Sequence, residues 1–128
     1  MTAYLTVADV MAIAEEIGAG GQLRDVGLLS SAVHRPQTVA FGVEAYPGVW
    51  QKAGAFMHSL IANHPFVDGN KRTGLVATMD FLDRNGIATE PFNEDLAYEL
   101  TMAVAAGKLS DVDEIAAALR DCLGGDRA

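Results

Sequence analysis

Apolar residues recur every three to four positions through most of this chain, and that spacing places them on one face of an α-helix. The first such run follows Thr6, whose pairing with Asp9 resembles a capping box, and it ends at Gly18. Residues 18–21 are then predicted to form a loop. The apolar stripe of this first predicted helix consists of Val7, Val10, Met11, Ile13 and Ala14.

A second predicted helix begins near Asp25 or Val26 and ends before Pro36, because a residue that precedes proline avoids helical backbone angles. The stretch 38–48 has the weakest pattern, and either an ordered loop or a short helix fits it. Residues 49–63 follow with a wide apolar face that predicts a strong helix.

A further helix is predicted from about Gly69 to Asn85, where an Asn-Gly pair fits a helix C-cap better than a hairpin turn. Residues 87–92 fit a brief strand. Asn93 then caps a helix that has two acids in its first turn and ends at Gly107.

Ser110 and Asp113 resemble another capping box, which opens a last helix to about Cys122. The whole pattern predicts an all-α fold, a compact bundle of five to seven helices with at most one very short β element. The chain has 128 residues, of which half are hydrophobic and a fifth are charged. This size and composition suit a single domain, residues 1–128, with a real core.

The composition also limits the location and the partners. No apolar run reaches the ~18 residues of a membrane span, and no signal peptide is recognisable, so a cytoplasmic location without membrane contact is expected. Cys122 is the one cysteine, so an intramolecular disulfide is impossible and a thiolate metal cluster is not expected. The net charge of −8 argues against direct nucleic-acid binding, since that binding depends on phosphate neutralisation.

Most of the chemistry lies in one run, His64-Pro65-Phe66-Val67-Asp68-Gly69-Asn70-Lys71-Arg72. It connects two predicted helices and combines a histidine, an acid, an amide and two cations. Few structural needs demand all of these together. We interpret the run as a phosphate site that carries its own base and a carboxylate for a metal ion.

The start of the second helix supplies the anion-binding part of this prediction. Asp68 is expected at its N-cap, with Gly69, Asn70 and Lys71 in the first turn. The unpaired N–H groups of that turn and the positive end of the helix dipole attract anions. Gly69 lets a ligand approach the backbone closely, and Lys71 and Arg72 add positive charge.

The remaining residues of the run suggest a reaction. Asp68 is suited to hold a magnesium ion that bridges phosphate oxygens, and His64 is placed to take a proton from an incoming hydroxyl. Phe66 most simply anchors the loop in the core. These parts suit phosphoryl or nucleotidyl transfer, in which positioning and charge neutralisation provide most of the catalysis.

Each residue also has a simpler explanation when it is taken alone. Asp68 then caps a helix, His64 is structural, Asn70 serves turn chemistry, and Lys71 and Arg72 are solvated surface charges. Their coincidence at this spacing favours the functional interpretation.

The run resembles the motif of the Fic/Doc superfamily, whose Fic branch reads H-x-F-x-[DE]-G-N-G-R-x-x-R. Lys71 replaces the second glycine of that form, and Leu75 replaces its last arginine. The Doc form, H-x-F-x-[DN]-[AG]-N-K-R, is matched completely. The segments 21–29 and 35–37 also resemble Doc sequences, so the resemblance covers about residues 4–122.

The resemblance implies a helical Fic/Doc domain and the Doc (death-on-curing) type of toxin from a type II toxin–antitoxin pair. Such toxins use ATP and Mg²⁺ to phosphorylate a threonine of elongation factor Tu, which inhibits translation and arrests growth. It implies that His64 is the general base, that Asp68 binds the metal, and that four residues hold the phosphates. Those four are Gly69, Asn70, Lys71 and Arg72.

The resemblance also implies a protein partner, an antitoxin whose Phd-like C-terminal segment folds as a helix on the toxin. Two alternatives remain open at this point. One is a Fic-type transferase of AMP or another nucleotidyl group to protein hydroxyls, which Lys71 and Leu75 disfavour. The other is a catalytically inactive antitoxin-binding domain.

Several residues outside the run have open roles. Arg24 is placed either to reach an anion or to form a structural salt bridge. His34 lies at a predicted helix end, and His58 is expected at the surface or behind the site. Tyr46 and Trp50 are expected in the core or in a groove.

Overall fold

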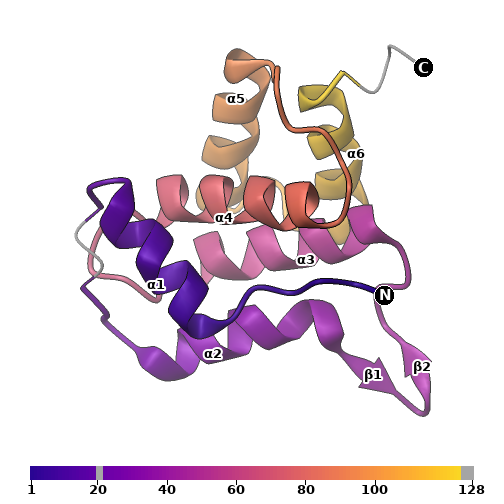
Figure 1. Ribbon diagram of the computed structural model, residues 1–128. Helices are drawn as coiled ribbons and strands as arrows, with labels where there is room; N and C mark the ends of the chain where they lie inside the picture. Colours follow the sequence, from indigo (N-terminus) through magenta and orange to yellow (C-terminus); the bar gives the residue numbers. More distant parts are fainter. Residues whose placement is uncertain (20–21, 125–128) are drawn as a thin grey trace.

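The computed structural model describes residues 1–19 and 22–124. Two positions of the predicted loop at 18–21, residues 20 and 21, therefore lie outside the described residues. Figure 1 shows a mainly helical chain, as the sequence predicts. The described helices are α1 (Val7–Glu16), α2 (Val26–His34), α3 (Val49–Ala62), α4 (Asn70–Arg84), α5 (Glu94–Ala105) and α6 (Val112–Cys122), with a 3-10 turn, η1 (Arg35–Gln37), after α2.

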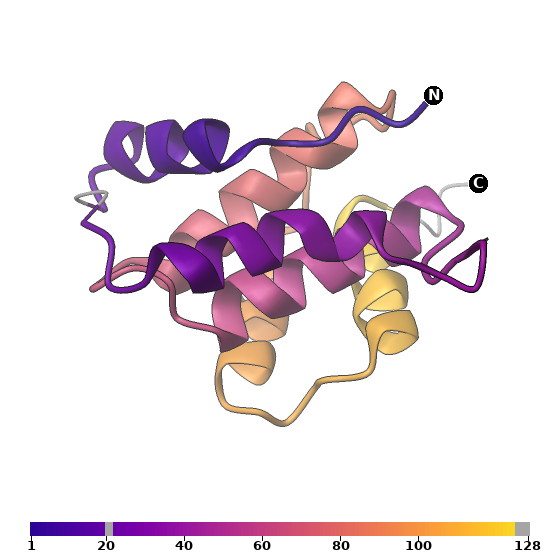
Figure 2. The same cartoon turned by 90° about the horizontal axis from the view of Figure 1, so that it is seen from below.

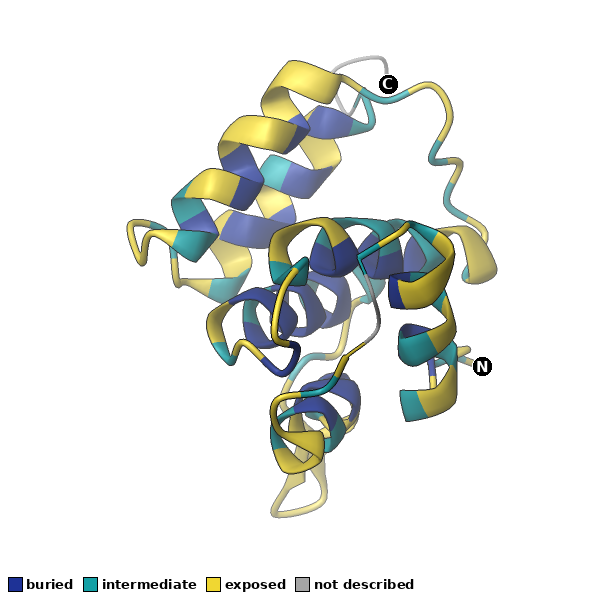
Figure 3. Ribbon diagram, turned by 90° about the vertical axis from the view of Figure 1, so that its left-hand side faces the viewer, coloured by how far each residue is buried: buried dark blue, intermediate teal, exposed yellow. Residues whose placement is uncertain are grey.

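Helix α3 lies at the centre of the fold and packs against α2, α4, α5 and α6. Helix α4 returns beside α3, and α5 and α6 stand side by side across this pair (Figure 1). Seen from below, α2 runs along the other side of α3 (Figure 2). The buried sides of the helices face one another and the outer sides are exposed (Figure 3). The largest buried apolar side chains are Phe56, Phe66, Phe81, Leu29, Met57, Leu60, Ile61, Leu82, Ile115 and Leu119.

Two glycines allow the helices around α3 to approach closely. A Cβ atom on Gly74 would lie 2.6 Å from Cγ1 of Ile61, and one on Gly54 would lie 2.8 Å from the carbonyl oxygen of Val112. Both positions therefore need a residue without a side chain. The α3–α4 contact at Gly74 lies beside the loop that joins these helices.

Several helix ends follow the predicted capping chemistry, and the start of α6 does not. The capping box of Thr6 and Asp9 is present, and Asn93 caps α5 by accepting from the backbone N–H of Leu96. Helix α6 is capped by Asp111, which accepts from Glu114 N–H at 3.0 Å, so the prediction of Ser110 as its cap is wrong. An acid and a serine at neighbouring positions compete for this task, and the carboxylate interacts better with the helix dipole.

The short β element is also misplaced in the prediction. Residues 87–92 form no strand, whereas β1 (Val39–Ala40) pairs antiparallel with β2 (Val43–Glu44) in the segment that was hardest to interpret. The turn residues Phe41 and Gly42 both have positive φ, 53° and 77°, as a tight type I′ hairpin turn requires. Residues 87–92 have no such turn and no adjacent strand.

Buried Lys52 attaches this hairpin to α3. Its ammonium group lies 3.0 Å from a carboxylate oxygen of Glu44 and contacts the carbonyl oxygen of Tyr46. The lysine is only 2% exposed. The ion pair with Glu44 thus offsets the cost of burying the ammonium charge of Lys52.

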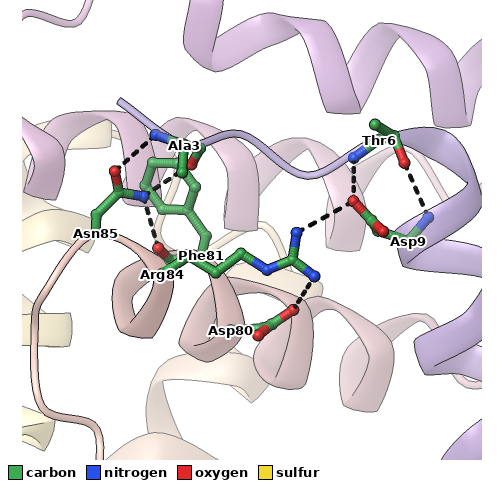
Figure 4. A network of polar contacts seen from close by, with 7 residues as sticks. All are labelled: Ala3, Thr6, Asp9, Asp80, Phe81, Arg84 and Asn85. Atoms are coloured by element: carbon green, nitrogen blue, oxygen red, sulfur yellow. Dashed lines mark hydrogen bonds and ion pairs between the residues drawn. The ribbon is translucent and has the colours of Figure 1, made fainter. Parts of the chain in front are cut away.

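The N-terminal segment is attached to the end of α4 (Figure 4). The backbone N–H and C=O of Ala3 both bond to the side-chain amide of Asn85, each at 2.8 Å. Arg84 reaches Asp9 of α1 at 3.2 Å and Asp80 at 3.1 Å. None of the described helices combines the length and the apolar character that a membrane span requires.

Candidate active site

The run of residues 64–72, in which the sequence concentrates its candidate catalytic groups, forms the loop between α3 and α4 and the start of α4. Phe66 is 1% exposed and anchors the loop in the core, as expected. The side chain of Asn70 closes the loop: Oδ1 accepts from the backbone N–H of Phe66 at 2.9 Å, and Nδ2 donates to the carbonyl of Phe66 at 3.0 Å. In this structure the side-chain amide of Asn70 thus bonds to the backbone of Phe66. Binding of a phosphate by Asn70 stays a prediction.

The N-terminus of α4 differs from the prediction in one respect. Gly69, with φ 76°, is the N-cap, and Asp68 lies one residue before it. The chain reverses sharply here, and the left-handed conformation that this needs is easiest for glycine. Oδ1 of Asp68 accepts from the N–H of Gly69 at 2.8 Å. The prediction of Asp68 as N-cap is therefore wrong, although its carboxylate still stands next to the helix start.

Residues 22–25 pair with the backbone of this loop. Leu23 and Phe66 form an isolated antiparallel β-bridge. The N–H of Arg24 donates to the carbonyl of Pro65 at 2.8 Å, and the N–H of Val67 donates to the carbonyl of Gln22 at 2.9 Å. The loop is thus paired with a segment that precedes it by about forty residues in sequence.

The loop after α1 also approaches the start of α4. A Cβ atom on Gly69 would lie 2.4 Å from Cβ of Ala19. Nη1 of Arg72 donates to the carbonyl of Ile17 at 3.1 Å, near the end of α1. The helix start is therefore enclosed on one side by α1 and its following loop.

Arg24 forms hydrogen bonds with the backbone instead of a salt bridge. Its Nε donates to the carbonyl of His64 at 2.7 Å, and its Nη2 donates to the carbonyl of Asn63 at 2.9 Å. None of the ion pairs found among residues 1–19 and 22–124 includes Arg24.

A cavity of about 940 Å³ opens over the loop and the start of α4. It brings together every site residue that the sequence predicted. These are His64, Asp68, Gly69, Asn70, Lys71 and Arg72.

A second part of the cavity wall is largely apolar and comes from α4, the segment before α5, and α5 itself. Its members include Leu75, Phe92, Tyr98 and Met102, together with the acid Glu94. Tyr98 is 66% exposed and Met102 is 39% exposed. This part of the wall was not predicted from the sequence, although exposed apolar residues four positions apart, on a helix whose charged residues are all acidic, are a usable signal.

The charges around the cavity suit an anionic ligand. Lys71 and Arg72 are exposed, and the ion pairs of the described part of the chain involve Lys52 and Arg84 instead. Both cations lie at the positive end of α4. No group of three or more described His, Cys, Asp or Glu residues is arranged to hold a metal. Among the described residues, two carboxylates line the cavity, and Asp68 is the one that stands beside the first turn of α4, whereas Glu94 lies at the start of α5.

The other two histidines lie outside this cavity. Nδ1 of His34 is 2.8 Å from the carbonyl of Ser30, one turn earlier on α2. Nδ1 of His58 is 2.7 Å from Nη1 of Arg35, and burial, followed by the nearby guanidinium, lowers the pKa of His58. His58 is half-buried on α3, which fits a place behind the site.

Trp50 and Tyr46 are half-buried beside cations. The guanidinium of Arg120 lies 5.4 Å from the ring centre of Trp50, and that of Arg35 lies 5.6 Å from the ring centre of Tyr46. Neither aromatic residue lines the cavity.

Comparison with known proteins adds to this geometry. The sequence model of the Fic/DOC family matches residues 4–82, which contain the motif. The chain is 48% identical over 122 residues to "Toxin Doc" of Mycolicibacterium smegmatis, which covers 93% of this chain and 92% of that protein. It is 30% identical over 103 residues to "Protein kinase doc" of Escherichia phage P1, covering 80% and 78% of the two chains.

Proposed function

This chain belongs to the Doc family of the Fic/Doc superfamily, and we propose that it is the toxin of a type II toxin–antitoxin module that phosphorylates a protein hydroxyl. The observation that carries the proposal is that all six predicted site residues line one cavity at the start of α4. The names of the two relatives, a toxin and a protein kinase, support the same activity.

The phosphate half of the cavity provides the binding site for ATP in this proposal. The first turn of α4 offers unpaired backbone N–H groups to a phosphate. The side of Gly69 that lacks a Cβ is taken up by Ala19, so the glycine is needed for the fold of the site rather than for space around the ligand. Lys71 and Arg72 stand in the same turn with no acid paired to them among the described residues. Their charge is therefore available to neutralise phosphate oxygens.

His64 acts as general base in the proposed reaction. The hydroxyl oxygen of the acceptor attacks the γ-phosphorus while its proton passes to the imidazole of His64. The bond between the γ-phosphorus and the bridging oxygen breaks, and ADP leaves. The exposed position of His64 at the cavity wall lets an acceptor hydroxyl reach it.

Asp68 is the residue that would hold Mg²⁺. One protein carboxylate fits this ion, because Mg²⁺ commonly keeps several waters and takes further oxygens from the substrate phosphates. When bound, the ion supplies neutralisation of the phosphate charge. One carboxylate oxygen of Asp68 already accepts from Gly69 N–H, which orients the side chain.

The position of Lys71 favours phosphate transfer over AMP transfer. A glycine there would leave backbone open to the α- and β-phosphates, whereas lysine fills that space and moves the positive charge. Leu75, which also lines the cavity, offers no phosphate contact where the Fic form has an arginine. We infer that ATP is held with its γ-phosphate toward the acceptor. Lys71→Gly is expected to reduce phosphate transfer, and an unchanged transfer rate would contradict this orientation.

The proposed target is a threonine of elongation factor Tu, whose modification would inhibit translation. The test is incubation of the purified protein with elongation factor Tu, Mg²⁺ and ATP, followed by intact-mass analysis of the factor. A mass gain of one phosphate, absent with His64→Ala and retained with His34→Ala, is expected. A gain of one AMP would establish the nucleotidyl transferase instead, and no gain would exclude this substrate.

The proposed partner is an antitoxin that binds as a helix. Expression of the chain alone is expected to arrest growth, and His64→Ala is expected to abolish the arrest while binding to the antitoxin is kept. Arrest that persists with a folded His64→Ala variant would favour toxicity through binding alone.

A further inference from the structure

The backbone of His64 has an unusual conformation. Its φ is 51°, in the left-handed region that residues other than glycine seldom occupy. Such a conformation has a cost and persists only when surrounding contacts hold it. The side chain of His64 contributes little to this, because its contact is a 3.3 Å approach of Nδ1 to the carbonyl of Ala62.

Arg24 provides the contacts that hold this turn. Its guanidinium donates to the carbonyls of Asn63 and His64, and its backbone N–H donates to the carbonyl of Pro65. Three consecutive carbonyls are thus bound by one residue. Hydrogen bonds from a charged donor are about twice as strong as neutral ones.

We propose that Arg24 is a positioning residue that fixes the backbone of His64 and thereby the direction of the catalytic imidazole. This inference rests on the proposed role of His64 as base. Because Arg24 is exposed, its replacement removes the support of the turn without opening the core.

The same geometry specifies a protonation form of the imidazole. With the turn held, Nδ1 of His64 lies 3.3 Å from the carbonyl oxygen of Ala62, which can only accept, so this contact favours the neutral ring with its proton on Nδ1. Nε2 then keeps its lone pair, which is the atom that takes the proton of an acceptor hydroxyl. When the turn is released, the ring loses this preference and both neutral forms become populated.

The kinetic test compares Arg24→Gln and Arg24→Lys with the wild type, with Arg84→Ala as a control for loss of a surface arginine far from the cavity. Arg24→Gln is expected to lower kcat by about 10²-fold while KM for ATP changes little, since a small misplacement of a catalytic group has effects of that size. Arg24→Lys keeps the charge and one donor, so it should restore part of kcat. A wild-type kcat in a folded Arg24→Gln variant would overturn the proposal.

A second measurement tests the positioning role of Arg24 independently of the proposed phosphate transfer. Nitrogen NMR of the His64 ring reports which ring nitrogen carries the proton, without any substrate. The wild type is expected to show protonation at Nδ1, and Arg24→Gln is expected to show a mixture of both forms. Identical spectra would refute positioning by Arg24. If the wild type transfers no phosphate but the spectra differ as expected, the proposed reaction fails and the positioning role stands.

Discussion

Arg35 and His58, two side chains that can both carry positive charge, lie in direct contact, with Nη1 of the arginine 2.7 Å from Nδ1 of the histidine. Arg35 also donates to the hydroxyls of Tyr46 and Ser59. No carboxylate pairs with Arg35 in the described part of the chain. His58 must therefore accept from the guanidinium as a neutral ring.

This contact predicts a loss of stability in mild acid. Burial and the charge of Arg35 lower the pKa of His58 in the folded state, so the unfolded state binds the proton more readily. The stabilisation is complete above the unfolded pKa, near 6.5, and is lost as the pH falls through the lower folded value. Urea unfolding across pH 5–8 measures it. His58→Gln should flatten the dependence in that range and His34→Gln should not, whereas an unaltered slope in His58→Gln would contradict the assignment.

Gly69 and Gly86 offer a matched pair of substitutions. Both have positive φ, 76° and 85°, but only at Gly69 does a new Cβ meet another atom, 2.4 Å away in Ala19. Gly86→Ala should cost about 1–2 kcal/mol of stability from backbone strain alone. Gly69→Ala should cost more and should also abolish phosphate transfer. Equal losses in a denaturant titration would show that Ala19 moves away freely.

Removal of the Asn70 amide should loosen the active-site loop. Asn70→Ala leaves the backbone N–H of buried Phe66 without its acceptor, at a cost of about 1–3 kcal/mol. Asn70→Asp keeps that acceptor but places a carboxylate oxygen against the carbonyl of Phe66 in place of the Nδ2 donor. It should therefore also lose stability, and its negative charge should weaken ATP binding. Urea titration and nucleotide-binding calorimetry measure the two effects. The prediction fails if the alanine variant is as stable as the wild type.

The hairpin turn offers a stabilising change. Phe41 is fully exposed, at 104%, and has the left-handed φ of 53°. Phe41→Asn creates the Asn-Gly pair that type I′ turns prefer and should raise the free energy of unfolding by about 1 kcal/mol. Val43→Asn, an exposed strand position, is the control and should give no gain. A stability decrease in Phe41→Asn would indicate that the phenyl ring has contacts in the folded state.

Cys122 should be unreactive in the folded protein. Burial, together with the charge of Asp121, raises the pKa of its thiol to about 11. At pH 8 the reactive thiolate is therefore scarce, and a thiol reagent should label the native protein slowly and the unfolded protein rapidly. Rapid labelling of the native chain would mean that the end of α6 opens readily.

Local sequence signals predicted most of the fold. The capping box of Thr6 and Asp9 and the cap at Asn93 each depend on residues a few positions apart, and both are present. Helix α2 ends before Pro36 as predicted, but the expected reason is wrong, because Arg35 keeps helical angles (φ −53°, ψ −44°) and the chain continues into the 3-10 turn η1. The capping errors arose where two neighbouring residues suit one task. Asp111 takes the cap that Ser110 was expected to provide, and Gly69 takes the cap position expected for Asp68.

Contacts between distant segments were not predictable in this way. The motif residues share one cavity as expected, because they are close in sequence. The bond between Arg24 and the carbonyl of His64 joins residues forty positions apart, and nothing local indicates it. The hairpin was missed because Phe41 is an unusual residue for a left-handed turn position.

Two parts of the chain line the cavity, and they can change independently of each other in evolution. The groups proposed to transfer phosphate lie on the α3–α4 loop and the start of α4, whereas Tyr98 and Met102 of the cavity wall lie on α5. Substitutions on α5 can therefore accumulate without altering the motif. Descendants of one ancestral protein can diverge in the molecules they recognise while they inherit the same chemistry.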